Sequence, residues 1–239
     1  MKILVTGSTG LLGSEVMARG RGMSAHECVP LRHADCAIED TTAVERFVTR
    51  VAPDAIINCA AIVSIDRCEE DKKTCEAINV EGVRNLLHAA RLLGKPVTFT
   101  QVSSSEVFGR VNEGEYDING YAEDIEPRPV TQYQKTKATA EGVVKDFATR
   151  YPQTVPQWYI VRAGWLYGAG RETFIEQFTK KLQTEGELEV IADQWRSPTW
   201  TKHFVDQMFT VMFEKYESGI YHIANEVSEG EASTQSVVD

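Results

Sequence analysis

The stretch KILVTGSTGLLG, residues 2–13, decides how the rest of this chain is organised. It reads as a short apolar strand, a glycine-rich turn and the start of a helix that runs to Gly20. In such a turn Gly7 permits the tight bend, Gly10 lets the backbone approach a pyrophosphate, and Gly13 allows close packing of helix on strand. A simple strand-to-helix turn gives a similar pattern, but the order of elements favours a dinucleotide site. The residues expected to hold the dinucleotide are Gly7, Thr9, Gly10, Leu11, Leu12 and Gly13.

The size and charge of the chain limit its functions. With 239 residues and 42% hydrophobic content, it suits one large domain, or one domain with a small appendage. A net charge of -10 argues against a general nucleic-acid or anionic-membrane surface. The N-terminal apolar run stops at Gly7, too early for a signal peptide or a membrane span. We therefore expect a cytoplasmic protein, and an anionic small molecule held by local Arg or Lys remains open as a ligand.

The cysteines give a prediction about redox state. They are odd in number and show no C-x-x-C spacing, which predicts reduced thiols and no metal site. The five are Cys28, Cys36, Cys59, Cys68 and Cys75.

Strands that alternate with helices predict an α/β fold with a Rossmann-like, doubly wound parallel sheet. Further strands are expected at residues 26–31, 55–58, 97–102 and 158–162. Helices are expected after a Thr42-x-x-Glu45 capping box and at residues 75–93. Residues 110–129 are expected to form a loop over the carboxyl ends of the strands, where such sheets bind ligands.

The pattern changes after Trp165. We predict a Rossmann-like, dinucleotide-binding domain over residues 1–165 and a small substrate-binding lobe over residues 166–239. The second part is expected to contain helices at 173–183 and 202–216 and strands at 188–191 and 220–224.

Tyr133 and Lys137 are the candidate catalytic pair. A Thr131-x-x-Gln134 capping box starts their helix, and four-residue spacing places both side chains on one face. A nearby ammonium favours the phenolate and so lowers the pKa of a tyrosine from its usual value of about 10. A half-buried Tyr and a snorkelling Lys on an ordinary amphipathic helix would look the same. Ser103-Ser-Ser-Glu106, at the end of the strand before the loop, faces this helix at the ligand edge.

Two further positions concern the cofactor. Arg32 ends the second strand, where Arg suits the 2′-phosphate of NADP(H) and an acid suits the free hydroxyl of NAD(H). Asp35 is close enough to compete as that acid, so NADP(H) is favoured and NAD(H) stays open. The small residues Cys59, Ala60 and Ala61 end the third strand and let a cofactor lie against the backbone.

Three motifs together resemble the extended short-chain dehydrogenase/reductase family: the glycine turn, Ser104, and Tyr133-x-x-x-Lys137. More narrowly, nearly the whole chain is similar to the dTDP-4-dehydrorhamnose reductases. The narrower similarity rests on Asn58-Cys-Ala-Ala61 with Asp66, Glu69 and Asn79, on Tyr133-Gln-Lys-Thr-Lys137, on Arg162-x-x-Trp165-Leu-Tyr-Gly168, and on Asp193-Gln194 with Ser197-Pro-Thr199.

The resemblance implies a reductase that moves a hydride from NADPH to the 4-keto carbon of a nucleotide-linked 4-keto-6-deoxy sugar, as in dTDP-rhamnose synthesis. Tyr133 would protonate the new alkoxide, Lys137 would hold the ribose and lower the pKa of Tyr133, and Ser104 would hydrogen-bond the substrate oxygen. Trp165 would stack beside the sugar ring, and the turn Ser197-Pro-Thr199 would lie near the nucleotide. Arg196 is the candidate cation for the diphosphate, and a homodimer is one expected state. The expected substrate-binding residues are Ser105, Glu106, Trp165, Arg196, Pro198 and Thr199.

Some positions depart from the reductase pattern. Ser104-Ser105-Glu106 stands where the reductases usually have Thr-Asp-Tyr, Val63 and Ile65 occupy two sugar-proximal positions, and Ala37 replaces a common adenine-side Asp. The segment Ser103-Ser-Ser-Glu-Val-Phe-Gly109 instead resembles nucleotide-sugar 4,6-dehydratases or epimerases, in which a Glu at this position removes a sugar proton. Residues 228–239 form a polar tail where reductases continue, so the second lobe is expected to be short or truncated. A non-catalytic NADP-binding regulatory subunit, like the methionine adenosyltransferase beta subunit, is the third alternative.

Overall fold

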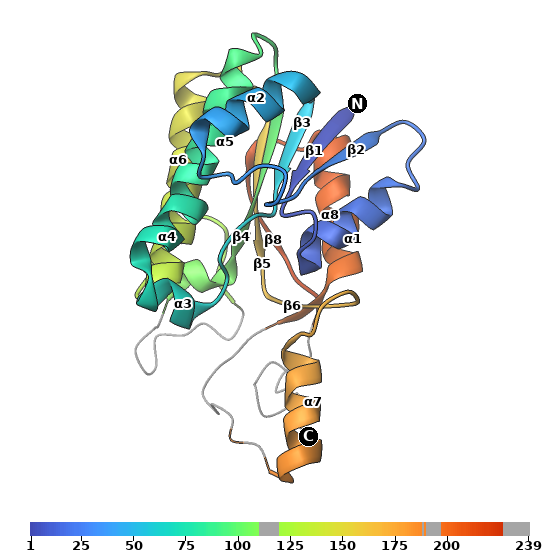
Figure 1. Ribbon diagram of the computed structural model, residues 1–239, viewed down its shortest axis with the longest axis vertical. Helices are drawn as coiled ribbons and strands as arrows, with labels where there is room; N and C mark the ends of the chain where they lie inside the picture. The colour runs from blue at the N-terminus through green and yellow to red at the C-terminus, as the bar shows by residue number, and fades with distance from the viewer. Residues whose placement is uncertain (110–119, 188, 190–196, 227–239) are drawn as a thin grey trace.

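The computed structural model describes residues 1–109, 120–187, 189 and 197–226 (Figure 1). Within these ranges no helix combines the length and the apolar character that crossing a bilayer requires.

In the described part of the chain, six parallel strands form the main sheet in the order β2-β1-β3-β4-β5-β8 (Figure 1). The order turns back between β1 and β3, so the carboxyl ends of these two strands open a crevice, the usual ligand position in a doubly wound sheet. The predicted fold class is therefore confirmed. The strands are β1 (Lys2–Thr6), β2 (Glu27–Leu31), β3 (Ala55–Asn58), β4 (Thr98–Ser104), β5 (Trp158–Ala163) and β8 (Gly219–Ile223).

Helices cover both faces of this sheet, because alternate side chains along each strand point to opposite faces. Figure 1 shows α1 (Leu11–Gly20) and α8 (Thr201–Phe213) on one face, and α2 (Thr41–Val51), α5 (Gly82–Leu92) and α6 (Gln132–Arg150) on the other. Each face has its own buried core. Ile3, Ile57 and Val161 contribute to the α1/α8 side; Leu4, Ile56 and Ile160 contribute to the other.

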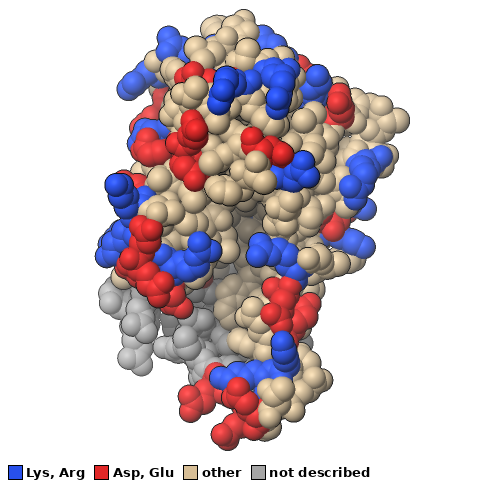
Figure 2. Space-filling view, in the orientation of Figure 1, with Lys and Arg blue, Asp and Glu red and all other residues tan. Residues whose placement is uncertain are grey.

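A smaller sheet lies below the main one. Strands β6 (Trp165–Tyr167) and β7 (Pro198–Trp200) pair in parallel, and α7 (Phe174–Glu185) projects from them away from the main body (Figure 1). Figure 2 shows the face hollowed between α7 and the main body, with acidic and basic side chains interspersed over the main body. The boundary at residue 165 stays a prediction, although α8 and β8, which follow it, return to the main sheet.

Three predicted elements differ from the structure. Asp40, not Thr42, caps α2, because its Oδ1 accepts from the backbone N of Ala43 at 3.0 Å. The helix expected at 75–93 starts earlier, as α4 (Lys72–Glu76), continues as the π-helical segment η1 (Ala77–Glu81), and then becomes α5. The turn expected at residues 197–199 is instead the start of strand β7, whose pairing partner lies more than 30 residues earlier in the chain. Most of the strand expected at 188–191 and half of the loop expected at 110–129 lie outside the described residues.

The prediction that all cysteines are reduced thiols is wrong for one pair. Cys68, in α3 (Ile65–Glu70), and Cys75, in α4, form a disulfide with their Cα atoms 5.2 Å apart. The short helix α3 was not expected, and it is the turn from α3 into α4 that brings the two sulfurs together. Cys28, Cys36 and Cys59 are free thiols.

The glycine turn gives a test of the packing. A Cβ on Gly13 would lie 2.2 Å from the carbonyl oxygen of Gly7, whereas a Cβ on Gly142, within α6, would meet nothing within 4 Å. We expect Gly13→Ala to lower the free energy of unfolding by about 1–3 kcal/mol, as overpacking does. Gly142→Ala is expected to raise it by about 0.5–1 kcal/mol through helix propensity. Urea unfolding measures both, and equal stability of the two variants would contradict this packing.

Candidate functional site

The helix that carries Tyr133 begins as the sequence predicts. Thr131 Oγ1 accepts from the backbone N of Gln134 at 3.3 Å, and Gln134 Oε1 accepts from the backbone N of Thr131 at 3.0 Å. The capping box is therefore confirmed. A second acceptor comes from α3, where Glu69 Oε1 accepts from the backbone N of Gln132 at 2.7 Å. The first turn of α6 is thus fixed from two sides.

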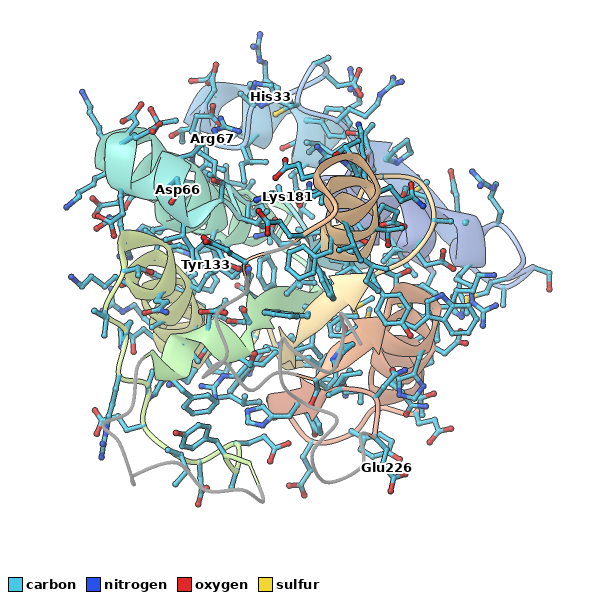
Figure 3. All side chains as sticks on the ribbon, turned by 90° about the horizontal axis from the view of Figure 1, so that it is seen from below. His33, Asp66, Arg67, Tyr133, Lys181 and Glu226 are labelled. Atoms are coloured by element: carbon cyan, nitrogen blue, oxygen red, sulfur yellow. A yellow bond between two sulfur atoms is a disulfide. The ribbon has the colours of Figure 1, made fainter. Side chains whose placement is uncertain are left out.

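Tyr133 and Lys137 are both buried on the face of α6 that lies against the end of β4. The side chains of Tyr133 and Ser104 share a hydrogen bond. Lys137 Nζ donates to the carbonyl oxygen of Val102 at 2.7 Å. The structure therefore brings together the three residues predicted to be catalytic. In the view of Figure 3, Tyr133 lies on the same side of the molecule as Asp66 and further from the rim, and His33 lies at the rim.

The expected direction of the pKa shift at Tyr133 is not what the structure shows. Burial raises the pKa of Tyr133 to about 12, the Ser104 hydrogen bond opposes this shift, and the charge of Glu106 adds to it. Burial also lowers the pKa of Lys137 to about 8, against the opposing effects of Glu141 and Cys59. Desolvation outweighs the expected effect of the lysine, whose ammonium is directed to Val102. Tyr133 is therefore a protonated phenol at neutral pH.

Glu106 lies beside this group in the 3₁₀ turn η2 (Ser105–Phe108). Its Oε2 accepts from Gln134 Nε2 at 3.1 Å, and its backbone N donates to Ser104 Oγ at 3.2 Å. Ser105 is half-buried in the same turn. The carboxylate of Glu106 thus lies beside the first turn of α6, close enough to affect the pKa of Tyr133.

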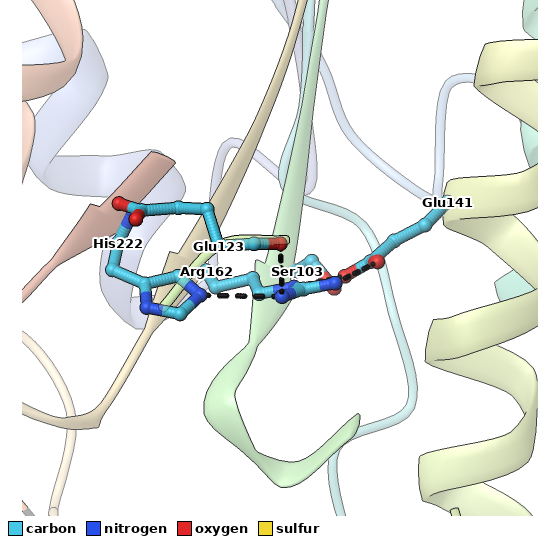
Figure 4. A network of polar contacts seen from close by, with 5 residues as sticks. All are labelled: Ser103, Glu123, Glu141, Arg162 and His222. Atoms are coloured by element: carbon cyan, nitrogen blue, oxygen red, sulfur yellow. Dashed lines mark hydrogen bonds and ion pairs between the residues drawn. The ribbon is translucent and has the colours of Figure 1, made fainter. Parts of the chain in front are cut away.

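A buried polar network that the sequence did not reveal lies behind the candidate catalytic residues (Figure 4). Glu141 binds Arg162 through two hydrogen bonds, of 2.9 and 2.7 Å, and accepts from Ser103 Oγ at 2.6 Å. Arg162 Nη1 also donates to His222 Nε2 at 3.2 Å. One signal was available in the sequence, since Glu141 lies four residues after Lys137, on the same face of α6.

The glycine turn fits a dinucleotide. Gly7 has a φ of +58°, and a Cβ there would lie 2.8 Å from the backbone N of Ala60. The residues that follow β3 therefore lie directly against the glycine turn, and Ala60 N donates to Thr6 Oγ1 at 3.2 Å. The Ser8 hydroxyl is buried there with no hydrogen-bond partner in the described residues. These features are suited to phosphate oxygens, which accept from backbone N–H groups and hydroxyls.

The other residues predicted to contact the cofactor differ in exposure. Thr9 is exposed, and Gly10 and Leu11 are half-buried, while the side chain of Leu12 lies in the core beside α8. Cys59 and Ala61, at the end of β3, are half-buried. Burial raises the pKa of the Cys59 thiol to about 12, so it is a neutral lining group.

Arg32 and Asp35, the two competing candidates at the end of β2, bind each other. Arg32 Nε donates to Asp35 Oδ2 at 2.7 Å, and the hydrogen bond from Arg32 lowers the pKa of Asp35. The side chain of Arg32 is 57% exposed, so its guanidinium still presents donors to solvent beside the crevice.

Three of the predicted substrate-binding residues, Trp165, Pro198 and Thr199, lie in the small sheet. Trp165 packs on Phe174 of α7, with ring centroids 4.7 Å apart. Thr199 is fully buried, and its hydroxyl donates to the carbonyl oxygen of Ser197 at 2.9 Å. Pro198, in the same strand, is half-buried. Arg196, with the Asp193-Gln194 motif, lies outside the described residues. In the described ranges, no group of three or more His, Cys, Asp or Glu side chains is arranged to hold a metal ion.

Comparison with known proteins identifies the family. The family model described as RmlD substrate binding domain matches residues 1–236. The chain belongs to this family. The resemblance seen in the motifs is thereby confirmed.

Relatives with curated names include the dTDP-4-dehydrorhamnose reductase of Mycolicibacterium smegmatis, which is 32% identical over 94% of this chain. The chain spans 64% of the length of that relative. The spore coat polysaccharide biosynthesis protein SpsK of Bacillus subtilis is 30% identical, over 94% of this chain and 73% of its own length.

Solved structures of RmlD-type reductases have the same fold. A dTDP-4-dehydrorhamnose reductase from Clostridium acetobutylicum is 33% identical, with a TM-score of 0.84 over 95% of this chain and 75% of its own. The reductase from Bacillus anthracis, solved in complex with NADP, is 26% identical, with a TM-score of 0.80 over the same shares.

The buried lysine predicts a pH dependence of stability. Because folding lowers the pKa of Lys137 from 10.5 to about 8, the unfolded chain holds this proton more tightly than the folded protein. Stability should therefore rise with pH from about 8 toward the unfolded pKa, relative to a Lys137→Met variant. We expect the difference in unfolding free energy to change by about 1 kcal/mol between pH 7 and pH 9, measured by urea unfolding.

Lys145→Met is the matched control, because Lys145 is exposed on the same helix. It should follow the wild-type curve. Parallel curves for wild type and Lys137→Met would contradict the burial of a titrating ammonium at this position.

Proposed function

We propose that the protein is an NADPH-dependent reductase of a dTDP-linked 4-keto-6-deoxy sugar. The single observation that carries this proposal is the hydrogen-bonded pair of Tyr133 and Ser104, with Lys137 behind it, at the carboxyl end of β4. The relatives named dTDP-4-dehydrorhamnose reductase support the substrate class. The Bacillus anthracis structure with NADP supports the cofactor.

The residues that would hold the cofactor line the crevice between β1 and β3. The backbone of Gly7, Gly10 and Gly13 would approach the pyrophosphate, and Arg32 would meet the 2′-phosphate beyond β2. Lys137 would hold the ribose. When bound, NADPH supplies the hydride.

Tyr133 is suited to act as the proton donor. A phenol with a pKa of about 12 is fully protonated at neutral pH, and reduction of a ketone requires one proton for the new alkoxide oxygen. Ser104, which shares a hydrogen bond with Tyr133, would donate to the same substrate oxygen. The phenolate left behind would recover its proton from solvent, with the nearby ammonium of Lys137 favouring its charge.

Three further features belong to the same proposal. Trp165, Pro198 and Arg196 would bind the sugar nucleotide, with Arg196 neutralising the diphosphate. The protein would work in the cytoplasm as a homodimer.

Replacing the proton donor is the direct test. Tyr133→Phe should reduce the rate of NADPH oxidation with a dTDP-4-keto-6-deoxy sugar by about 10²–10⁴-fold, because the donor is lost while the ring remains. Tyr151→Phe, at the other end of α6, is the matched control and should keep wild-type turnover. Absence of NADPH oxidation by the wild type across several nucleotide-linked keto sugars would refute the proposal. Turnover that Tyr133→Phe abolishes would also exclude a non-catalytic regulatory subunit.

A second candidate function rests on Glu106. A carboxylate beside Tyr133 has the chemistry of a base that removes a sugar proton, as a 4,6-dehydratase or epimerase requires. For the reductase, Glu106→Gln should change NADPH oxidation by less than about tenfold, because Glu106 takes no proton in that reaction. For the dehydratase, the same change should cost at least about 10²-fold in conversion of a nucleotide hexose without added NADPH. Consumption of one NADPH for each sugar converted would support the reductase and exclude the dehydratase.

A further inference from the structure

Three side chains on one face of α6 contact three successive residues of β4. Tyr133, Lys137 and Glu141 are spaced four apart along the helix. They bind the Ser104 hydroxyl, the Val102 carbonyl and the Ser103 hydroxyl in turn. We call these contacts the α6–β4 ladder. Glu141 is the contact that the proposed chemistry does not use.

Glu141 is more deeply buried than Tyr133 or Lys137. Its side chain and that of Arg162 are each 1% exposed. Both carboxylate oxygens accept from Arg162, and one also accepts from Ser103. The carboxylate therefore joins α6 to β4 and β5 at once, one helical turn after Lys137.

Other charged and titratable groups surround this part of the site. Cys59 faces Lys137 from the end of β3. Arg162 approaches from β5 and His222 from β8, and Glu123 in the 120–129 segment accepts from the backbone N of His222 at 3.0 Å. Burial lowers the pKa of His222, so this imidazole is neutral at pH 7 and accepts from Arg162. Glu141 is the group from its own helix that favours the charged form of Lys137.

A contribution to the stability of the fold does not by itself explain why Glu141 and Arg162 form a buried ion pair. A buried pair seldom contributes more to stability than apolar side chains of similar volume would, because both charges are desolvated. Its placement next to a buried lysine is therefore better explained by an effect on that lysine.

We propose that Glu141 is a positioning residue of the site, whose carboxylate fixes the α6 face that presents Tyr133 and Lys137 and supplies the negative charge that keeps Lys137 an ammonium. The proposal rests on the reductase function but concerns the state of the site before any sugar binds. Arg162 and Ser103 hold the carboxylate in place.

The test follows the protonation of Lys137 directly. In protein labelled with ¹³Cε-lysine, the Lys137 resonance is assigned by its absence from Lys137→Arg, and its shift is followed against pH. The double variant Glu141→Gln/Arg162→Gln removes both charges and keeps hydrogen-bonding groups. We expect the midpoint, about 8 in the wild type, to fall by about one pH unit, because a nearby carboxylate raises the pKa of a lysine. Glu141→Asp, which retains the charge, should restore a midpoint near that of the wild type.

A second readout is NADPH affinity, measured by fluorescence titration. The pH above which affinity declines should move down by the same amount in the double variant. Neither measurement needs a keto sugar, so failure here is distinct from failure of the proposed reaction.

The control removes a different ion pair. Arg19 binds Asp206 between α1 and α8, and Arg19→Gln/Asp206→Asn should leave the Lys137 midpoint unchanged. If the Gln pair does not fold, Glu141→Leu/Arg162→Met is read instead, since apolar pairs usually replace buried ion pairs without loss of stability. A wild-type midpoint in either folded double variant would overturn the proposal. Failure of both variants to fold would also overturn it, because the pair would then serve folding itself.

Discussion

The contact between one face of α6 and the carboxyl end of β4 is the interaction on which the site depends. It buries a lysine, which is costly unless the ammonium finds acceptors and a counter-charge. The carbonyl of Val102 and the carboxylate of Glu141 supply these. Because the helix and the strand are joined at three successive residues, a shift of either element would disturb Tyr133, Lys137 and Glu141 together.

Features with local signals could be predicted from the sequence. The bounds of β1 and β3, the glycine turn and the Thr131 capping box follow from residue types a few positions apart. The proximity of Ser104, Tyr133 and Lys137 could be predicted too, since the end of β4 and the start of α6 meet at the ligand edge of a doubly wound sheet. The start of α2 was predicted two residues too late, because Asp40 and not Thr42 is its N-cap. Helix bounds commonly differ by one or two residues.

Features that depend on distant contacts could not be predicted. The pairing of Trp165–Tyr167 with Pro198–Trp200 joins two three-residue strands that carry no periodic pattern of their own. The disulfide arises from the turn between α3 and α4. The direction of the pKa shift at Tyr133 was wrong because spacing reveals the charged neighbour but not the depth of burial.

The parallel pairing of β6 with β7 also affects how readily the chain between them tolerates changes in length. The chain leaves the small sheet after Tyr167 and returns to it at Pro198, in the strand paired with the one it left. Segments whose ends meet tolerate changes in length at little cost, since the closure entropy grows slowly with loop size. The region around α7 can therefore change in length at little entropic cost, while the contacts of the ladder and of the glycine turn stay as they are.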